Sequence, residues 1–396
     1  MLSYKKDFFS HLAQTSPAPI ALEIKSAKGV FLKDINGKKY VDLISGIAVS
    51  NLGHRHPNII KAIKKQADAF THLMVYGEYI QAPQAEFADK ICKLLPESLN
   101  SVYFVNSGSE AVEGSLKLAK RFTGRTEIIS FKNAYHGSTH GALSVMGDET
   151  LKAPFRPLLP GIRILDFDNK KALESITKKT ACVIIEPIQG EAGTIVPDKT
   201  FHQAIRKRCT ETGTILILDE IQTGFGRTGK LFAHQHFGIV PDILLLGKAM
   251  GGGLPLGAFV ANKKVMSTLS DNPPLGHITT FGGHPLSCAS GLAALNVLLK
   301  EKLVSKVPEK EKLFRTLLKH KKIKEIRGKG LMLALQFENE AICKKVIELC
   351  LKNGIIVDWF LFCSSAMRIV PPLIITKAEI KQACSKILFS IEQSIS

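Results

Sequence analysis

The amino-acid sequence predicts an α/β fold with a mainly parallel central sheet. Between positions 162 and 247, short apolar runs alternate with stretches of helical periodicity, which is typical of parallel strands joined by crossover helices. Three of these runs are short and bounded by turn residues, which favours buried strands over helices. The chain of 396 residues exceeds the size that one hydrophobic core usually supports, so we expect two domains. The three runs span 181–185, 215–218 and 242–247.

Each of the three runs leads into a charged residue, in turn Glu186, Asp219 and Lys248. A polar residue after one strand is common, because turns are polar. In open parallel sheets, however, ligands bind at the carboxyl ends of the strands. If the three strands are neighbours, two carboxylates and one amine meet in a single crevice. The glycines at 251–253 then let the backbone approach a ligand closely.

The elements before these runs follow from hairpin, helix and strand patterns. Ser107 and Glu110 have the spacing of a capping box at the start of a helix that extends to about 122. The expected elements are a hairpin around Asn36-Gly37, helices over 59–70 and 85–95, and a strand over 101–105.

After the central region, the composition becomes lysine-rich near position 300. The run from Lys306 to Lys329 is interpreted as a solvated helical face, and Thr376 with Glu379 predicts the cap of a final helix. Other expected elements are helices over 201–212, from 287 and over 340–352, and strands over 331–337 and 367–370. The expected organisation is an N-terminal segment (1–50) that joins the small domain, a large domain (51–298) and a C-terminal small domain (299–396).

Composition and charge narrow the class of protein. With 45% hydrophobic and 22% charged residues, the chain is an ordinary globular protein, and no apolar run approaches the ~18 residues of a membrane span. The net charge of +18 is spread along the chain, which argues against nucleic-acid binding, although it can steer anionic substrates. His54 and His56 lack further ligands at metal-binding spacing, so we expect no metal. Eight scattered cysteines and the absence of a secretory signal predict a cytoplasmic protein.

Two further stretches suit a phosphorylated, planar cofactor. Gly108 and Ser109 open a helix, whose positive end attracts phosphate. Tyr135 precedes His136 in a loop and can lay its ring over a planar group. With the lysine and carboxylates at the strand ends, this set suggests pyridoxal 5′-phosphate, in which a lysine forms a Schiff base and a carboxylate keeps the pyridine nitrogen protonated.

At these residues the chain resembles the class III (omega-amino) pyridoxal-phosphate aminotransferases of fold type I. The resemblance covers nearly the whole chain, from the loop at 53–57 to the segment 368–372, and within the family it is strongest to the acetylornithine and ornithine aminotransferases. Its most specific motifs are Asp219-Glu220-Ile221-Gln222-Thr223-Gly224 and Gly247-Lys248. The resemblance implies a central sheet of seven strands with helices on both faces, a small α+β domain, and a homodimer with shared active sites.

The resemblance also implies roles for individual residues. Lys248 would form the Schiff base and Asp219 would pair with the pyridinium, while Arg368 would bind the substrate carboxylate and Glu191 would pair with Arg368 in its absence. A pocket of this kind would take an omega-amino donor and then a 2-oxo acid. Other residues implied at the cofactor are Gly108, Ser109, Tyr135, His136, Glu186, Gln222 and, from the neighbouring subunit, Thr280; Ser138 and Thr279 are assigned to the substrate.

The chain departs from the acetylornithine and ornithine enzymes at three places. Ser138 stands where those enzymes usually carry an arginine for the α-carboxylate of the donor. Thr15 replaces a tyrosine of the ornithine enzymes, and the segment 72–79 differs from the acetylornithine pattern. N-acetylornithine and ornithine are the first candidates, but lysine, 4-aminobutyrate or a diamine stays open as the donor.

Two other functional classes are alternatives to an aminotransferase. An aminomutase of the glutamate-1-semialdehyde type shares the fold but returns the amino group to its own substrate. A nucleotide-binding loop would place its glycines before Lys followed by Ser or Thr, whereas here Ala249 follows Lys248 and the glycines come later. A role without catalysis would require the loss of Lys248 or Asp219, and both are present.

Overall fold

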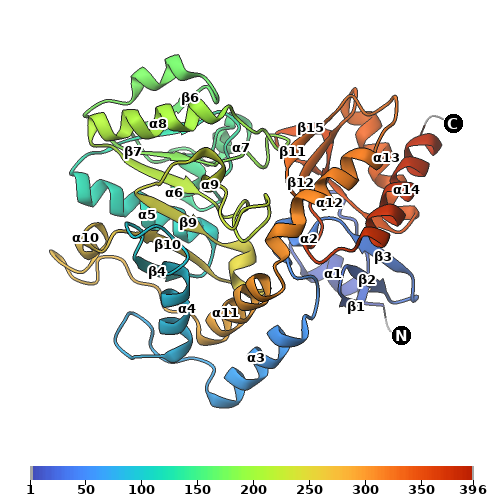
Figure 1. The fold of residues 1–396 in the computed structure, drawn as a ribbon, viewed down its shortest axis with the longest axis horizontal. Helices are drawn as coiled ribbons and strands as arrows, with labels where there is room; N and C mark the ends of the chain where they lie inside the picture. Colours follow the sequence, from blue (N-terminus) through green and yellow to red (C-terminus); the bar gives the residue numbers. More distant parts are fainter. Residues whose placement is uncertain (1–2, 395–396) are drawn as a thin grey trace.

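The computed structural model of the protein describes residues 3–394 and shows two lobes (Figure 1). The larger lobe is built on a seven-stranded sheet in the order β4-β10-β9-β8-β7-β5-β6. Of these strands β10 alone runs against the others, because it pairs antiparallel with both β4 and β9. The predicted α/β class with a mainly parallel sheet is confirmed. The strands are β4 (Ser101–Val105), β5 (Glu127–Phe131), β6 (Ile162–Leu165), β7 (Thr180–Ile185), β8 (Ile215–Asp219), β9 (Ile243–Leu246) and β10 (Gly257–Ala261).

The central strands divide their side chains between two hydrophobic clusters, one on each face of the sheet. Ile184 and Leu245 belong to the cluster that includes the apolar side of α5, whereas Ile185 and Leu246 belong to the cluster that includes α4, α8 and α11. This two-residue period explains why the runs read as continuously apolar. The helices of this lobe are α3 (Pro57–Ala69), α4 (Ala82–Cys92), α5 (Gly108–Thr123), α6 (His140–Ser144), α7 (Glu149–Lys152), η1 (Ala153–Phe155), η2 (Lys170–Ser175), α8 (Lys199–Thr212), α9 (His234–Phe237), η3 (Lys248–Gly251), α10 (Lys263–Met266), η4 (Ser267–Leu269) and α11 (Pro285–Lys300).

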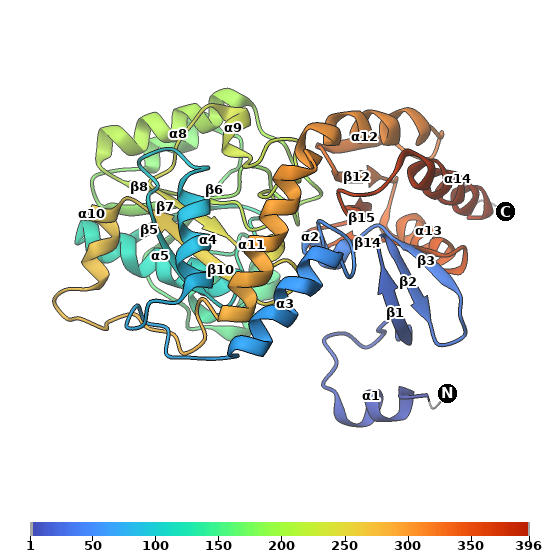
Figure 2. The ribbon, with the colours of Figure 1, turned by 60° about the horizontal axis from the view of Figure 1, so that its bottom comes forward.

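Helices α3 and α4 begin earlier than the sequence pattern suggested. Pro57 and Pro83 lie in their first turns, where proline is tolerated because its missing amide has no helical partner. Figure 2 shows α3 beside α11, and the two helices are in extensive contact.

The smaller lobe joins the two ends of the chain. The predicted hairpin is confirmed, since β2 pairs antiparallel with β3. Strand β3 also pairs with β13 in parallel, so the hairpin shares a sheet with the C-terminal region. The domain boundaries at 50 and 298 stay a prediction. The strands are β1 (Ile24–Lys28), β2 (Phe31–Asp34), β3 (Lys39–Asp42), β11 (Glu325–Lys329), β12 (Met332–Gln336), β13 (Ile355–Ile356), β14 (Asp358–Phe360) and β15 (Cys363–Ile369), and the helices are α1 (Lys5–His11), α2 (Ser45–Ala48), α12 (Leu303–Leu317), α13 (Glu340–Lys352) and α14 (Lys377–Gln393).

Two helix caps test the capping predictions. At α14 the full box is present, since the Thr376 hydroxyl accepts from the amide of Glu379 and the Glu379 carboxylate accepts from the amide of Thr376. At α5 only half of the box forms: Ser107 Oγ accepts from the amide of Glu110, but the Glu110 carboxylate accepts from the amide and side chain of Asn106. The prediction at α5 was therefore half right.

The interpretation of Lys306–Lys329 as one solvated helical face is wrong. Helix α12 ends at Leu317, and the last residues of the run form β11. Lys310 is buried, and its ammonium donates to the carbonyl of Leu373. Arg315 donates to the carbonyl of Ile326. Charged residues of the run therefore also hold α12 to neighbouring segments.

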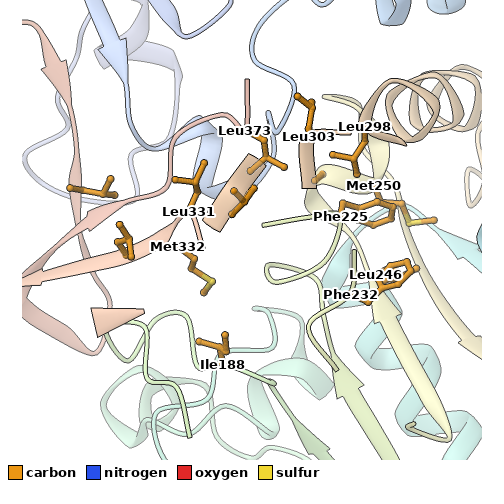
Figure 3. Packing of buried hydrophobic residues seen from close by; sticks show 14 of the residues in the cluster. Ile188, Phe225, Phe232, Leu246, Met250, Leu298, Leu303, Leu331, Met332 and Leu373 are labelled. Carbon is orange, nitrogen blue, oxygen red and sulfur yellow. The ribbon is translucent and has the colours of Figure 1, made fainter. Parts of the chain in front are cut away.

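The two lobes meet across an apolar contact. Figure 3 shows Leu331, Met332 and Leu373 of the smaller lobe near Ile188, Phe225 and Met250 of the larger one, all within one buried cluster. Within residues 3–394, no helix is long and apolar enough to cross a membrane, and no group of three or more His, Cys, Asp and Glu side chains could hold a metal ion.

Candidate active site

The three charged strand ends lie along one edge of the sheet. Strands β7, β8 and β9 are adjacent and parallel, with Ile185 opposite Leu218 and Asp219 opposite Leu245. Glu186, Asp219 and Lys248 therefore follow neighbouring strands at the carboxyl edge, as the sequence predicted. Open α/β sheets bind their ligands at this edge.

Asp219 is held in a fixed position. Its Oδ2 lies 2.7 Å from His136 Nδ1, and its Oδ1 accepts the amide of Ile221 at 3.0 Å. Both side chains of the Asp219–His136 pair are buried. Among the described residues, His136 Nε2 has no hydrogen-bond partner. A buried carboxylate oriented in this way is suited to pair with a positively charged N–H group.

Glu186 connects two loops of the site. One carboxylate oxygen accepts the amide of Tyr135 at 3.2 Å, and the other accepts the amide of Gly190 at 3.0 Å. Burial raises the pKa of Glu186 to about 7, against the opposing effect of the neighbouring His136. The geometry makes Glu186 a support for the loops that carry Tyr135 and Glu191.

The start of α5 lies against the same edge. Gly108 Cα is 3.6 Å from the position that a Cβ on Gly247 would occupy, so the helix N-terminus and the Lys248 turn are neighbours. The amide of Ser138 donates to Ser109 Oγ at 3.4 Å. Gly137 has a φ of +126°, and a Cβ there would clash with Ser109 Oγ. A 16-residue helix directs its unpaired amides into this region, which suits a phosphate group.

Lys248 is half-buried and lies among charged side chains. Its φ of +44° is unusual for a residue with a side chain, and such backbone outliers concentrate at functional sites. Burial lowers the pKa of Lys248 below its ordinary value, while Glu191 and Asp219 partly oppose that shift. A lowered pKa increases the fraction of neutral amine, which is the nucleophilic form.

Glu191 and Arg368 form a buried bidentate ion pair. Arg368 Nη1 and Nη2 donate to the two Glu191 oxygens at 3.0 and 2.6 Å. Burial alone would raise the pKa of Glu191, but the charge and hydrogen bonds of Arg368 outweigh it and lower the pKa. Both side chains are at most 7% exposed. A guanidinium in this setting can bind a substrate carboxylate whenever Glu191 releases it.

The remaining predicted residues lie around this set. Tyr135 Oη is 3.2 Å from Ser138 Oγ, and Gln222 packs against Gly190, next to Glu191. Thr279 Oγ1 accepts from Asn106 Nδ2 at 2.9 Å, close to the start of α5. Thr280 is exposed, and its Oγ1 lies 3.3 Å from Tyr76 Oη. Within the chain, Thr280 contacts Tyr76.

Sequence reasoning missed one charged residue of the site. Asp358 Oδ1 lies 3.2 Å from Arg368 Nε, so Arg368 faces two carboxylates. Asp358 belongs to no motif, and its position depends on the pairing of β14 with β15. A hairpin pattern over 358–369 was the one signal that could have revealed it.

The residues present fit pyridoxal phosphate. A half-buried lysine with a lowered pKa and an oriented buried carboxylate lie at the carboxyl edge of the sheet. The glycine and serine at the N-terminus of α5 and the loop tyrosine lie at the same edge. The unpaired His136 Nε2 is a further buried polar atom at this place among the described residues. This donor set matches the needs of a phosphorylated pyridine aldehyde.

Comparison with known proteins agrees with this geometry. The profile of the aminotransferase class-III family matches residues 12–390. The chain is 41% identical over 388 residues to the acetylornithine aminotransferase of Methanocaldococcus jannaschii, covering 93% of each chain. It is 37% identical over 373 residues to the [LysW]-aminoadipate semialdehyde/glutamate semialdehyde transaminase of Sulfurisphaera tokodaii, covering 91% and 92%.

Solved structures show the same likeness. The ornithine aminotransferase of Toxoplasma gondii, a structure with partial occupancy of pyridoxal phosphate at its active site, superposes with a TM-score of 0.92 at 32% identity and covers 99% of this chain and 96% of that one. The fold is therefore fold type I, the protein is a transaminase and its cofactor is pyridoxal 5′-phosphate. With the family profile matching almost from end to end, the chain belongs to the class III aminotransferases.

Proposed function

We propose that the protein moves an amino group from an omega-amino donor to 2-oxoglutarate, yielding an aldehyde and glutamate, with N-acetylornithine or ornithine as the donor. The observation that carries this proposal is the buried Glu191–Arg368 pair, which can close for a donor and open for a dicarboxylate. Several relatives act on acetylornithine, which supports the choice of donor.

The assignment of residues to the cofactor is part of the proposal. Bound pyridoxal phosphate supplies an electron sink for the charge left when a proton leaves the substrate carbon. Asp219, oriented by His136, would hold the protonated ring nitrogen, and Lys248 Nζ would serve as the base that carries the substrate proton. Gly108 and Ser109, with Thr280 of a second subunit, are assigned to the phosphate. Tyr135 is assigned to the face of the ring and Gln222 to the ring hydroxyl. Glu186 is assigned to the support of the loops that surround the cofactor.

The exchange at Arg368 requires only a side-chain movement. The carbonyl of Glu191 accepts the amide of Phe362 at 3.0 Å, and the carbonyl of Gly193 accepts from Arg327 Nε at 3.0 Å. The backbone of this loop is thus tied to the smaller lobe at Glu191 itself and again two residues later, at Gly193. We propose that the Glu191 carboxylate rotates away while its backbone stays in place, and that a 2-oxoglutarate carboxylate takes its position.

The steady-state kinetics with N-acetylornithine and 2-oxoglutarate test this function. We expect parallel double-reciprocal plots, because the aldehyde product leaves before 2-oxoglutarate binds. Glutamate and the aldehyde should form in equal amounts. Turnover without any added 2-oxo acid, with the amino group kept on the substrate, would support the aminomutase and reject the transaminase proposal.

The state of Lys248 gives a pH prediction. Because burial lowers its pKa, the rate at which the apoenzyme attaches pyridoxal phosphate should rise with pH and level off with a midpoint below 10.5. Glu191 is the main charge that opposes this shift, so Glu191→Gln should move the midpoint further down. The growth of the visible absorbance band after mixing measures the rate. Glu348→Gln, at an exposed site paired with Lys352, is the control. A midpoint that rises in Glu191→Gln contradicts the assignment.

We also propose a homodimer in which the loop of Thr280 reaches the active site of the other subunit. The Tyr76–Thr280 contact joins two segments rich in exposed apolar side chains, and the rings of His72 and Phe281 lie 4.8 Å apart. Exposed apolar patches of this kind favour association. The exposed residues of these segments are Leu73, Met74, Tyr76, Tyr79, Ile80, Ile278 and Phe281.

Mixed dimers test the sharing of sites. Thr280→Ala should weaken cofactor affinity about tenfold through the loss of one phosphate contact. When this variant is allowed to exchange subunits with Lys248→Ala, the hybrid contains one site with both Lys248 and Thr280 intact. We expect half of the hybrid sites to regain wild-type affinity, measured by cofactor titration of activity. Affinity that stays weak in the hybrids would place Thr280 in its own subunit's site.

Ile80→Glu should shift sedimentation toward monomer, whereas Phe389→Glu, exposed on α14, should not.

The cytoplasm is the proposed location. All eight cysteines are free thiols, which suits a reducing compartment. Retention of full activity in strong thiol reductant is the expected result, and loss of activity on reduction would contradict it.

A further inference from the structure

The guanidinium of Arg368 is contacted on more sides than binding one carboxylate requires. Its Nη atoms bind Glu191, and Nη2 also donates to the carbonyl of Trp359 at 3.2 Å. Asp358 Oδ1 lies 3.2 Å from Nε as an ion pair without hydrogen-bond geometry, and the guanidinium carbon lies 4.6 Å from the centre of the Phe360 ring. Three successive residues of β14 therefore contact Arg368.

The two carboxylates differ in how they are held. Asp358 lies directly opposite Arg368 in the antiparallel pairing of β14 with β15, so the strand register fixes their separation. Glu191 lies in a loop of the other lobe, after the end of β7. One partner is thus built into the same hairpin as Arg368, and the other can leave by rotating its side chain.

We propose that Asp358 is a positioning residue that keeps Arg368 directed into the substrate pocket when Glu191 leaves, and that it thereby sets the affinity for the anionic acceptor. The inference rests on the proposed exchange of Glu191 for a carboxylate of 2-oxoglutarate. In the closed state, Glu191 orients Arg368 from the pocket side. In the open state, Asp358, Trp359 and Phe360 hold the guanidinium from behind, and the acceptor carboxylate finds it already aligned.

The ionisation of Asp358 supports this role. Burial raises its pKa to about 6, Arg368 opposes that rise, and Glu191 and Asp42 add to it. The charged groups that face Asp358 are thus Arg368 from β15, Glu191 from the loop after β7 and Asp42 from the end of β3. Because the ionised form attracts Arg368, its hold weakens as the pH falls through about 6. The affinity of the wild-type enzyme for the acceptor should therefore decrease as the pH falls through about 6. In Asp358→Asn this part of the pH dependence should be missing.

The experiment separates the two half-reactions of the holoenzyme by stopped-flow absorbance. Asp358→Asn keeps the size of the side chain and removes its charge. We expect the variant to raise the apparent Kd for 2-oxoglutarate about tenfold. The rate and apparent Kd of the donor half-reaction should stay at wild-type values. Glu340→Gln is the control. Glu340 lies on α13, and its exposed carboxylate accepts a hydrogen bond from Ser364 of β15, the strand that carries Arg368.

A second measurement does not depend on turnover. Calorimetric titration of the holoenzyme with glutarate, an unreactive dicarboxylate, should show the same loss of affinity in Asp358→Asn, and a flatter dependence on pH between 5 and 7. Unchanged or tighter binding of glutarate and 2-oxoglutarate overturns the proposal, as does an equal loss of affinity for the donor, which would indicate general damage to the hairpin. If the wild-type enzyme itself does not prefer 2-oxoglutarate to pyruvate, the proposed acceptor is wrong, and that failure is visible without any variant.

Discussion

Replacing Lys248 with alanine is expected to lower kcat by at least about 10⁴-fold, because the change removes both the covalent anchor of the cofactor and the base that moves the substrate proton. The amine lies at the carboxyl edge of the sheet, beside two buried carboxylates. Single-turnover and steady-state assays with saturating cofactor measure the effect.

The variant should still bind pyridoxal phosphate weakly. The phosphate site at Gly108 and Ser109 belongs to α5 and does not depend on the lysine side chain. We therefore expect retention of cofactor in equilibrium dialysis, without the absorbance of the lysine-bound form. Lys264→Ala, at an exposed position on α10, is the control and should keep wild-type activity. Near-normal turnover by Lys248→Ala would remove the lysine from the mechanism.

Replacing Asp219 with asparagine is expected to lower kcat by about 10²–10³-fold, since the neutral amide no longer stabilises a protonated ring nitrogen. Asparagine keeps the volume of the side chain and one of its two oxygens, so the loss is electrostatic rather than steric. Cofactor affinity should fall as well, because a buried charge pair is lost. The assay is kcat at saturating donor, acceptor and cofactor, together with the cofactor Kd.

Two controls separate chemistry from folding in this variant. The thermal midpoint of the apoenzyme should change little, because the hydrogen bond from the amide of Ile221 can be kept by the remaining oxygen. Asp89→Asn, at a side chain 57% exposed on α4, should behave as wild type in both assays. A fully active Asp219→Asn enzyme would show that the carboxylate is not the partner of the cofactor.

The central sheet and its charged edge could be predicted because both depend on local patterns. A buried parallel strand requires a continuous apolar run, and β7, β8 and β9 each supply one that ends at a charged residue or just before it. The adjacency of these strands follows from the rule that successive parallel strands tend to be neighbours. Glu186, Asp219 and Lys248 were therefore placed together correctly from sequence.

The surroundings of Arg368 could not be predicted in full, because they depend on contacts between distant parts of the chain. The contact with Asp358 follows from the register of β14 with β15, which includes an irregularity between Trp359 and Phe360. One misplaced residue in that register would put Asp358 on the opposite face. No spacing rule in the sequence identifies it.

Arg227 shows the same limit for a buried charge. The sequence presents it in a polar turn, yet its side chain is fully buried and donates to the carbonyls of Leu331 and Pro371. Burial lowers the pKa of Arg227 to about 9. Leu331 and Pro371 lie more than a hundred positions from Arg227 in the chain. Only the folded structure therefore reveals that Arg227 connects the two lobes.

The turn at Ser45–Ala48 is a third feature beyond local prediction. Ser45, Ile47 and Ala48 all have positive φ, a conformation that costs roughly 1–2 kcal/mol for each residue with a side chain. Ser45 Oγ donates to the carbonyl of Val370 at 2.6 Å, which ties the turn to the C-terminal region. Strain of this kind is imposed by tertiary contacts, and the local sequence favours other conformations.

The most direct test of the account is a single-turnover absorbance measurement on the purified holoenzyme. N-acetylornithine, ornithine, lysine, 4-aminobutyrate and putrescine are added separately in the absence of any 2-oxo acid, and the loss of the lysine-bound cofactor band is followed. We predict fast conversion with N-acetylornithine or ornithine, and recovery of the band on addition of 2-oxoglutarate. Conversion only with donors that lack an α-carboxylate would contradict the proposed donor and assign selectivity to Ser138. A protein with no such band would contradict the assignment of the cofactor to Lys248.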